Sequence, residues 1–210
     1  MKTEELIAAL AADTTPGPAP ARRMARALPP ALLVSGLALV TLWHTRPDLA
    51  QVLASPTVYK TLVPAVLALA ALWLAQGLSR PDARVTAQRA LMGVLLAGLA
   101  ALLVYALATT PMAEVAEILD TRDFSNCLIS VPVLAALPLA GALWALRAGA
   151  PRSPGWAGAA AGLVAGGSAA AIYSLHCPHD PLMYFFPAYG SAMAIVTAAG
   201  AVIGRRLLRW

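Results

Sequence analysis

The chain has 210 residues, of which 60% are hydrophobic and only 12% are charged, and its net charge is +5. Soluble domains are about 45–50% apolar and about 25% charged, so a water-soluble fold of this length could not bury so much apolar surface. The composition excludes a soluble catalytic domain and predicts a chain whose main solvent is lipid.

The chain opens with a polar segment, residues 1–27, which carries charges from Lys2 onward. It lacks the pattern of a cleavable signal peptide. Thr3 belongs to the residue types that cap helices, and Glu4 and Glu5 follow where the first turn of a helix favours acids. We therefore expect a short helix at the start of this segment.

This short helix has an apolar stripe formed by Leu6, Ile7 and Leu10. About ten residues are too few for a stable isolated helix in water, and such segments commonly order on a partner by laying an apolar stripe into a groove. A helix lying flat on the membrane is the alternative. A protein partner is favoured because an anionic inner leaflet would repel Glu4 and Glu5.

Residues 28–210 contain six apolar runs of membrane-spanning length. One transmembrane helix needs about 20 residues, so six helices with short connections nearly fill the chain. The expected spans are residues 28–43, 62–78, 91–108, 128–146, 156–175 and 184–208, and the first could begin before Pro29 and Pro30. The predicted fold is an all-α, polytopic bundle of six transmembrane helices in which consecutive helices are antiparallel neighbours.

The basic residues are divided unevenly between the two sides that this topology defines. Twelve of the 15 Lys and Arg residues fall on the side of the N-terminal segment, and the other three are Arg46, Lys60 and Arg122. Cytoplasmic loops carry the excess of Lys and Arg, so both termini are expected in the cytoplasm. The positive charge is dispersed over four short segments, which argues against direct binding of nucleic acid.

Glycines recur at helical spacing in the last two spans. They are Gly158, Gly162 and Gly166 in the fifth span and Gly200 and Gly204 in the sixth. Small residues at this spacing let helix backbones approach closely in a membrane. Packing within the bundle is the expected role, and a dimer interface is the alternative.

Charged side chains and histidines are absent from the middle of every expected span. Ion-coupled transporters and proton relays usually need such a group inside the membrane. A small transporter or channel without ion coupling remains an alternative function.

The two cysteines, Cys127 and Cys177, lie at the start of the fourth expected span and at the end of the fifth. These spans form a hairpin, so at about 1.5 Å of rise per residue both cysteines should reach a similar depth near the outer surface. Three interpretations stay open: a redox- or metal-responsive pair, a permanent disulfide in an oxidising periplasm, and two unconnected small residues. A membrane thiol-redox enzyme usually carries Cys-x-x-Cys, which is missing, so no catalytic residue is assigned.

Two histidines flank the second cysteine in residues 176–180, His-Cys-Pro-His-Asp. Thiolates and imidazoles are ligands for zinc, cadmium or copper(I). Cys127, Cys177, His176 and His179 are therefore candidate ligands of a transiently bound metal, and ordinary loop residues are the alternative. We expect no permanently bound metal and no cofactor.

Several segments together resemble the NrsF-like family of membrane anti-sigma factors. These segments are residues 2–11, 46–49, 127–128, 146–151, 176–180 and 204–210. The likeness covers nearly the whole chain and is most specific in the Cys-Leu pair at 127–128 and the His-Cys-Pro-x-Asp run at 176–180.

The resemblance implies a non-enzymatic regulator of the bacterial inner membrane that holds a sigma factor of the extracytoplasmic-function group through its N-terminal segment. On this interpretation Cys127 and Cys177 sense a heavy metal or an oxidant outside the cell, and the sigma factor is then released. The contact residues would be Thr3, Glu4, Glu5, Leu6, Ile7 and Leu10.

Overall fold

The computed structural model describes residues 2–12, 19–119 and 122–209, without the side chains of residues 9–10, 118–119 and 122–123. Every regular element in these ranges is helical. The helices are α1 (Thr3–Ala12), α2 (Pro20–Ala38), α3 (Leu49–Leu53), α4 (Tyr59–Leu78), α5 (Thr86–Thr109), α6 (Met112–Leu119), α7 (Arg122–Leu146), α8 (Pro154–Tyr173) and α9 (Leu182–Leu207), with a π-helix η1 (Leu39–Trp43) and a 3-10 helix η2 (Pro56–Val58).

Within the described residues, six helical stretches are long and apolar enough to cross a membrane. These stretches are Pro20–Trp43, Pro56–Leu78, Thr86–Thr109, Phe124–Leu146, Pro154–Tyr173 and Leu182–Leu207. Their number and order confirm the predicted set of six spans.

The first spanning stretch begins at Pro20, earlier than the apolar run that starts at Leu28. Pro20 lies at the helix start, where its fixed φ angle suits the first turn and its missing N–H is not needed. Pro29 and Pro30 lie inside α2. The π-helix η1 completes this stretch and ends at His44, which has a positive φ of 62°.

Two connections that were expected to be plain loops contain helices. The segment between the first two spans folds into α3 and η2, and α6 lies between the third and fourth spans. The second spanning helix begins before Leu62, so Lys60 lies inside α4 and is buried.

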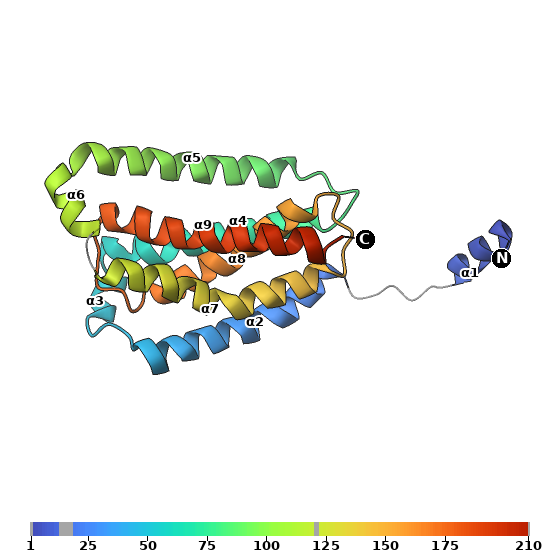
Figure 1. Ribbon diagram of the computed structural model, residues 1–210, viewed down its shortest axis with the longest axis horizontal. Helices are drawn as coiled ribbons and strands as arrows, with labels where there is room; N and C mark the ends of the chain where they lie inside the picture. The colour runs from blue at the N-terminus through green and yellow to red at the C-terminus, as the bar shows by residue number, and fades with distance from the viewer. Residues whose placement is uncertain (1, 13–18, 120–121, 210) are drawn as a thin grey trace.

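Helix α8 occupies the centre of the bundle and packs against α9, α4 and α7 (Figure 1). The expectation that all consecutive spans are neighbours is wrong for two pairs: among the described residues α5, the third span, packs against α4 and α9 and not against α7, the fourth, and the first span also departs from it. Among the described residues α2 packs mainly against α7, not against α4, and Figure 1 shows α2 and α7 side by side along one edge.

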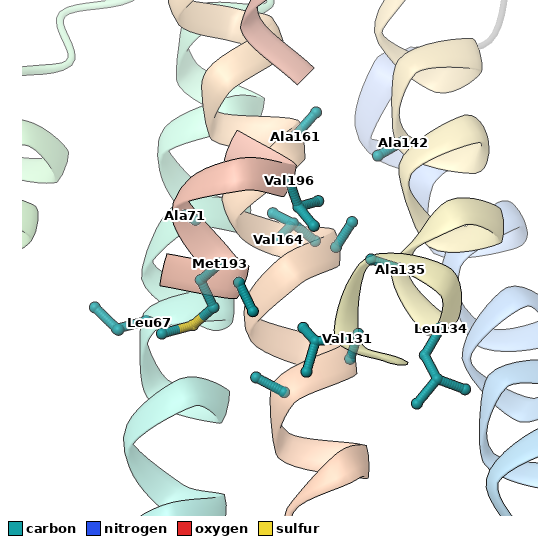
Figure 2. Packing of buried hydrophobic residues seen from close by; sticks show 14 of the residues in the cluster. Leu67, Ala71, Val131, Leu134, Ala135, Ala142, Ala161, Val164, Met193 and Val196 are labelled. Carbon is teal, nitrogen blue, oxygen red and sulfur yellow. The ribbon is translucent and has the colours of Figure 1, made fainter. Parts of the chain in front are cut away.

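Small residues explain how α8 can be surrounded so closely. A Cβ atom added at Gly158 would lie 2.2 Å from the carbonyl oxygen of Gly200 on α9, and one added at Gly167 would lie 2.8 Å from that of Pro64 on α4. Figure 2 shows the core that this packing encloses, with Val164 of α8 close to Val196 of α9. The predicted role of these glycines within the bundle is confirmed.

Backbone hydrogen bonds join separate connections at both ends of the bundle. We call the end where α2 begins and α9 finishes the tail end (Figure 1). The opposite end, where α7 begins and α8 finishes, carries Cys127 and Cys177 and is called the cysteine end. At the tail end the Ala150 N–H donates to the Ser79 carbonyl, at 3.0 Å. At the cysteine end the Arg46 N–H donates to the Leu175 carbonyl, also at 3.0 Å.

Candidate functional site

Helix α1 is closed at its start by its own residues. The carbonyl of Lys2 accepts from the Leu6 N–H at 3.2 Å, and the Glu5 carboxylate accepts from the Lys2 N–H at 3.0 Å. Lys2 therefore occupies the cap position, and the prediction that Thr3 caps the helix is wrong by one residue. Thr3 is the first helical residue instead.

The apolar side chains of α1 face solvent. Leu6 is 42% exposed and Ile7 is 58% exposed, and Figure 1 shows α1 apart from the bundle. Glu4 and Glu5 lie in its first turn, as predicted. The side chain of Leu10 lies outside the described residues.

Cys127 and Cys177 come together at the cysteine end as buried, free thiols. Cys127 belongs to α7 and is 0% exposed, and Cys177 lies in the loop after α8 and is 1% exposed. Both side chains belong to the same buried core cluster. Both lie at the same end of the bundle, at the start of α7 and after the end of α8, and they form no disulfide in this structure.

Two further helices contribute polar groups to the thiol pair. Tyr189 of α9 belongs to the same buried cluster as both cysteines, and Lys60 of α4 donates to the Cys177 carbonyl. Tyr189 and Lys60 are themselves buried. The thiol pair is therefore a meeting point of α4, α7, α9 and the loop after α8.

The two histidines point to other partners. Nδ1 of His176 lies 2.8 Å from the carbonyl oxygen of His44. The ring of His179 stacks on Tyr184 with centroids 4.7 Å apart. Among the described residues no three or more His, Cys, Asp or Glu side chains are grouped to hold a metal ion. A metal that used the thiols and both imidazoles would require this loop to rearrange.

Arg46 and Asp180 are the centre of an ion-pair cluster beside Cys177. The guanidinium donates to Asp48 from Nε at 2.7 Å and from Nη2 at 2.9 Å, and to Asp180 from Nη1 at 2.9 Å and from Nη2 at 3.2 Å. Nη1 also donates to the Cys177 carbonyl at 3.1 Å. Since a guanidinium has five N–H donors, every donor of this buried side chain is used.

Lys60 reaches the same loop from α4. Its ammonium group donates to the Cys177 carbonyl at 3.0 Å, to a carboxylate oxygen of Asp180 at 2.9 Å and to the His179 carbonyl. An ammonium group has three donors, so Lys60 is also fully paired. The Cys177 carbonyl accepts from both cations, and its position is thereby tied to α4 and to the residues that follow α2.

The ion pairs change the acid–base behaviour of the loop carboxylates. Burial opposes the ionisation of Asp180, but hydrogen bonds from Arg46 and Lys60 outweigh it and hold the pKa of Asp180 below its usual value. The hydrogen bond from Arg46 also lowers the pKa of Asp48. Hydrogen bonds to Asp48 and Asp180 raise the pKa of Arg46 above its already high value. Asp48, Asp180 and Arg46 are therefore charged near neutral pH.

The sequence analysis counted Arg46 and Lys60 only as two of the three basic residues on the less basic side of the chain. It missed that both side chains pair with Asp180. Their separation of more than 100 residues from Asp180 hides the pairing. A signal was available, because cations at the ends of apolar spans are costly to bury and are usually paired. The Asp of the His-Cys-Pro-His-Asp run was the partner to look for.

Two hydrogen bonds join the first span to α7, which carries Cys127. The Ser35 hydroxyl donates to the Leu134 carbonyl at 2.8 Å, and the Trp43 indole donates to the Ser130 hydroxyl at 2.9 Å. The first span is thus attached both to α7 and, through Arg46, to the loop of Cys177.

The described residues thus form an all-helical bundle with six helices long and apolar enough to cross a membrane, an exposed N-terminal helix and two buried thiols beside an ion-pair cluster. The family model described as negative regulator of sigma F (NrsF) matches residues 10–210. The chain therefore belongs to the NrsF family, which confirms the resemblance seen in the sequence.

Two relatives match over the full length of both chains. The chain is 36% identical over 221 residues to the anti-sigma-F factor NrsF of Caulobacter vibrioides (strain NA1000 / CB15N). It is 32% identical over 215 residues to a protein of Azospira oryzae (strain ATCC BAA-33 / DSM 13638 / PS) named probable anti-sigma-F factor NrsF. No solved structure matches the chain.

Proposed function

We propose that the chain is an integral-membrane anti-sigma factor that binds an extracytoplasmic-function sigma factor through α1 and releases it when Cys127 and Cys177 react with a soft metal ion or an oxidant. The names of the two relatives support a sigma factor as partner. The observation that carries the proposal is the exposure of Leu6 and Ile7 on a short helix outside the bundle.

Helix α1 has the properties of a segment that is completed by a partner. It has ten residues, too few to be stable alone in water. Full burial of one Leu or Ile side chain contributes roughly 1.5–3 kcal/mol, so docking Leu6 and Ile7 in a groove offsets the cost of ordering the segment. Thr3, Glu4, Glu5 and Leu10 complete the proposed contact surface.

The thiol pair can act as one chemical unit. A soft metal ion would bind both as thiolates and displace two protons, whereas an oxidant would take two electrons as the sulfurs join and two protons leave. Either reaction requires both cysteines and fixes the distance between α7 and the loop of Cys177. His176 and His179 would join a metal only after leaving their present partners.

The ion-pair cluster offers a route from this reaction to α1. Because Arg46 donates to the Cys177 carbonyl, a displacement of Cys177 would also displace Arg46. Arg46 lies three residues after the end of the first span at Trp43. That span leads back to Pro20 and, through the preceding residues, to α1. We infer that ligation of the thiols changes how α2 packs on α7, a small helix shift of the kind that transmits many signals.

The charge distribution supports the placement of the chain in a bacterial inner membrane with both termini in the cytoplasm. Twelve of the 15 basic residues belong to the tail-end side, the side that the positive-inside rule assigns to the cytoplasm. Of the three others, Arg46 and Lys60 are buried in ion pairs, which leaves the cysteine end with little unpaired positive charge. The thiols would then face the periplasmic side.

Co-purification tests whether α1 binds the sigma factor. The full-length chain is co-expressed with each candidate extracytoplasmic-function sigma factor of the same cell and isolated from membranes. The Leu6→Ser, Ile7→Ser double variant should lose the sigma factor while accumulating normally. Ala8→Ser is the matched control, because Ala8 lies on the opposite face of α1 and is also exposed. Full retention of the sigma factor by the double variant would mean that the sigma factor binds a different part of the chain.

A further inference from the structure

A long apolar groove lies between α2, α4 and α8, and the proposed function does not use it. Its volume is ≈ 1040 Å³, and its lining extends from Ala21 at the start of α2 to Val40 in η1. The groove exists because α2 packs mainly against α7 and leaves its side toward α4 open. The walls are almost entirely aliphatic, with Leu32 and Leu69 on facing helices.

The wall of the groove that α2 forms has room for an additional group. Gly36 is one of its lining residues, and a Cβ atom added there would meet no atom within 4 Å. Leu33 and Leu37 on the same wall are exposed. An aliphatic chain can therefore lie against α2 without displacing a side chain.

Two arginines of α2 lie beside the tail end of this groove, outside its apolar lining. Arg22 and Arg26 are spaced by one helical turn and continue the stripe of Pro29, Leu33 and Leu37, since residues three or four apart share a helix face. Both arginines are exposed. Arg23, by contrast, is turned to the other side, where its guanidinium lies 5.4 Å from the ring centre of Trp144 on α7.

We propose that the groove binds an anionic phospholipid, with an acyl chain along α2 and the phosphate held by Arg22 and Arg26. Guanidinium groups match phosphate oxygens in pairs, and basic sites beside transmembrane helices bind anionic headgroups. A helix from a second copy of the chain fits less well. The sequence has no Asp or Glu in any of the six spans, so such a helix would offer no carboxylate to these arginines.

Native mass spectrometry of the full-length chain in detergent tests the site. The probes are phosphatidylglycerol and phosphatidylcholine with identical acyl chains. The wild-type chain should retain phosphatidylglycerol more strongly. The Arg22→Gln, Arg26→Gln double variant should lose this preference, by roughly fivefold for each arginine.

Gly36→Leu, which fills the groove, should weaken the retention of both lipids. The lipid-facing Gly93→Leu on α5, where an added Cβ also meets nothing within 4 Å, and the tail-end Arg206→Gln should behave as the wild type.

The outcomes separate the possible occupants. Gly36→Leu has open space around the new side chain, and its folding is checked by helical circular dichroism. If it misfolds, the arginine variant decides alone. Equal retention of the two lipids by the wild type, or equal losses in Gly36→Leu and Gly93→Leu, would show non-specific lipid only and overturn the proposal. A wild-type dimer that Gly36→Leu dissociates would make a second copy the occupant.

Discussion

At the residue scale, Arg46 and Lys60 hold the loop that carries Cys177: Lys60 donates all three of its N–H groups to it, and Arg46 donates three of its five. Replacing Lys60 by Met takes one donor each from the carbonyls of Cys177 and His179 and from the Asp180 carboxylate, while Arg46 still donates to Cys177 and Asp180. We expect a loss of about 1–3 kcal/mol in the free energy of unfolding, the range for unsatisfied buried polar groups; the partial exposure of Asp180 places the loss below that of a fully buried pair. Denaturant unfolding in mild detergent, followed by circular dichroism, measures it.

Arg84 provides the control for Lys60. It is exposed on the connection between α4 and α5, so Arg84→Met should change the unfolding free energy by less than about 0.5 kcal/mol. Hydrogen exchange should be faster in the loop of Cys177 for Lys60→Met alone. Unchanged exchange there would mean that the cluster does not hold the loop.

The pH dependence of this loop follows from the depressed pKa of Asp180. A carboxylate whose folded pKa is lowered contributes stability above its unfolded pKa, about 3.9, and this contribution is lost as the pH falls through the lower folded value. Loop protection should therefore be flat between about pH 5 and pH 8 and fall below about pH 4. Asp180→Asn should remove part of the acid-dependent loss, and the remainder belongs to Asp48. A loss of protection centred near pH 6 would contradict this assignment.

Single residues also show where sequence reasoning succeeds and where it stops. Cys127 and Cys177 could be placed at one end of the bundle because a hairpin and the helical rise fix their relative depth. The pairing of Arg46 and Lys60 with Asp180 could not be found in the same way, because it joins the connection after η1, helix α4 and the loop after α8, which are distant in sequence. Contacts of this kind depend on which helices are neighbours, and no local pattern encodes that.

At the element scale, the close approach of α8 and α9 is the feature most sensitive to small changes. Gly158→Ala would place a methyl group 2.2 Å from the Gly200 carbonyl oxygen, so the helices must separate. Such overpacking typically costs about 1–3 kcal/mol. A Cβ atom added at Gly93 on α5 meets no atom within 4 Å. Gly93→Ala should therefore be neutral or stabilise the fold by about 0.5–1 kcal/mol, because alanine lowers the backbone entropy of the unfolded chain. Equal stability of the two variants in detergent unfolding would argue against this packing.

The elements themselves were largely predictable, whereas their neighbours were not. Apolar run length identified all six spans, but the start of α2 at Pro20 was missed because Pro29 and Pro30 and the arginines before them interrupt the apolar pattern. Membrane helices tolerate such prolines. The packing of α2 on α7 was missed because short connections favour consecutive neighbours, and the connection after η1 is long enough to hold α3 and η2.

At the scale of the whole molecule, the uneven distribution of basic residues predicts one orientation. Reporter domains fused after residue 210, or inserted at Arg84 or Arg152, should report a cytoplasmic location, because these positions lie on the side with twelve of the 15 basic residues. An insertion near Glu117, in the connection that contains α6, should report the periplasm. The reverse pattern would put the thiols in the reducing cytoplasm and remove the basis for an outside signal.

The most direct test of the proposed function is the release of the sigma factor by the thiol reaction. The full-length chain is reconstituted in nanodiscs with a fluorescently labelled sigma factor, and fluorescence anisotropy is followed while cadmium or a thiol oxidant is added. The wild-type complex should dissociate. Cys127→Ser, Cys177→Ser and the double variant should all bind the sigma factor and all fail to release it, because each reaction needs both sulfurs. Normal release from the single and double variants would contradict the proposal that these two cysteines control binding.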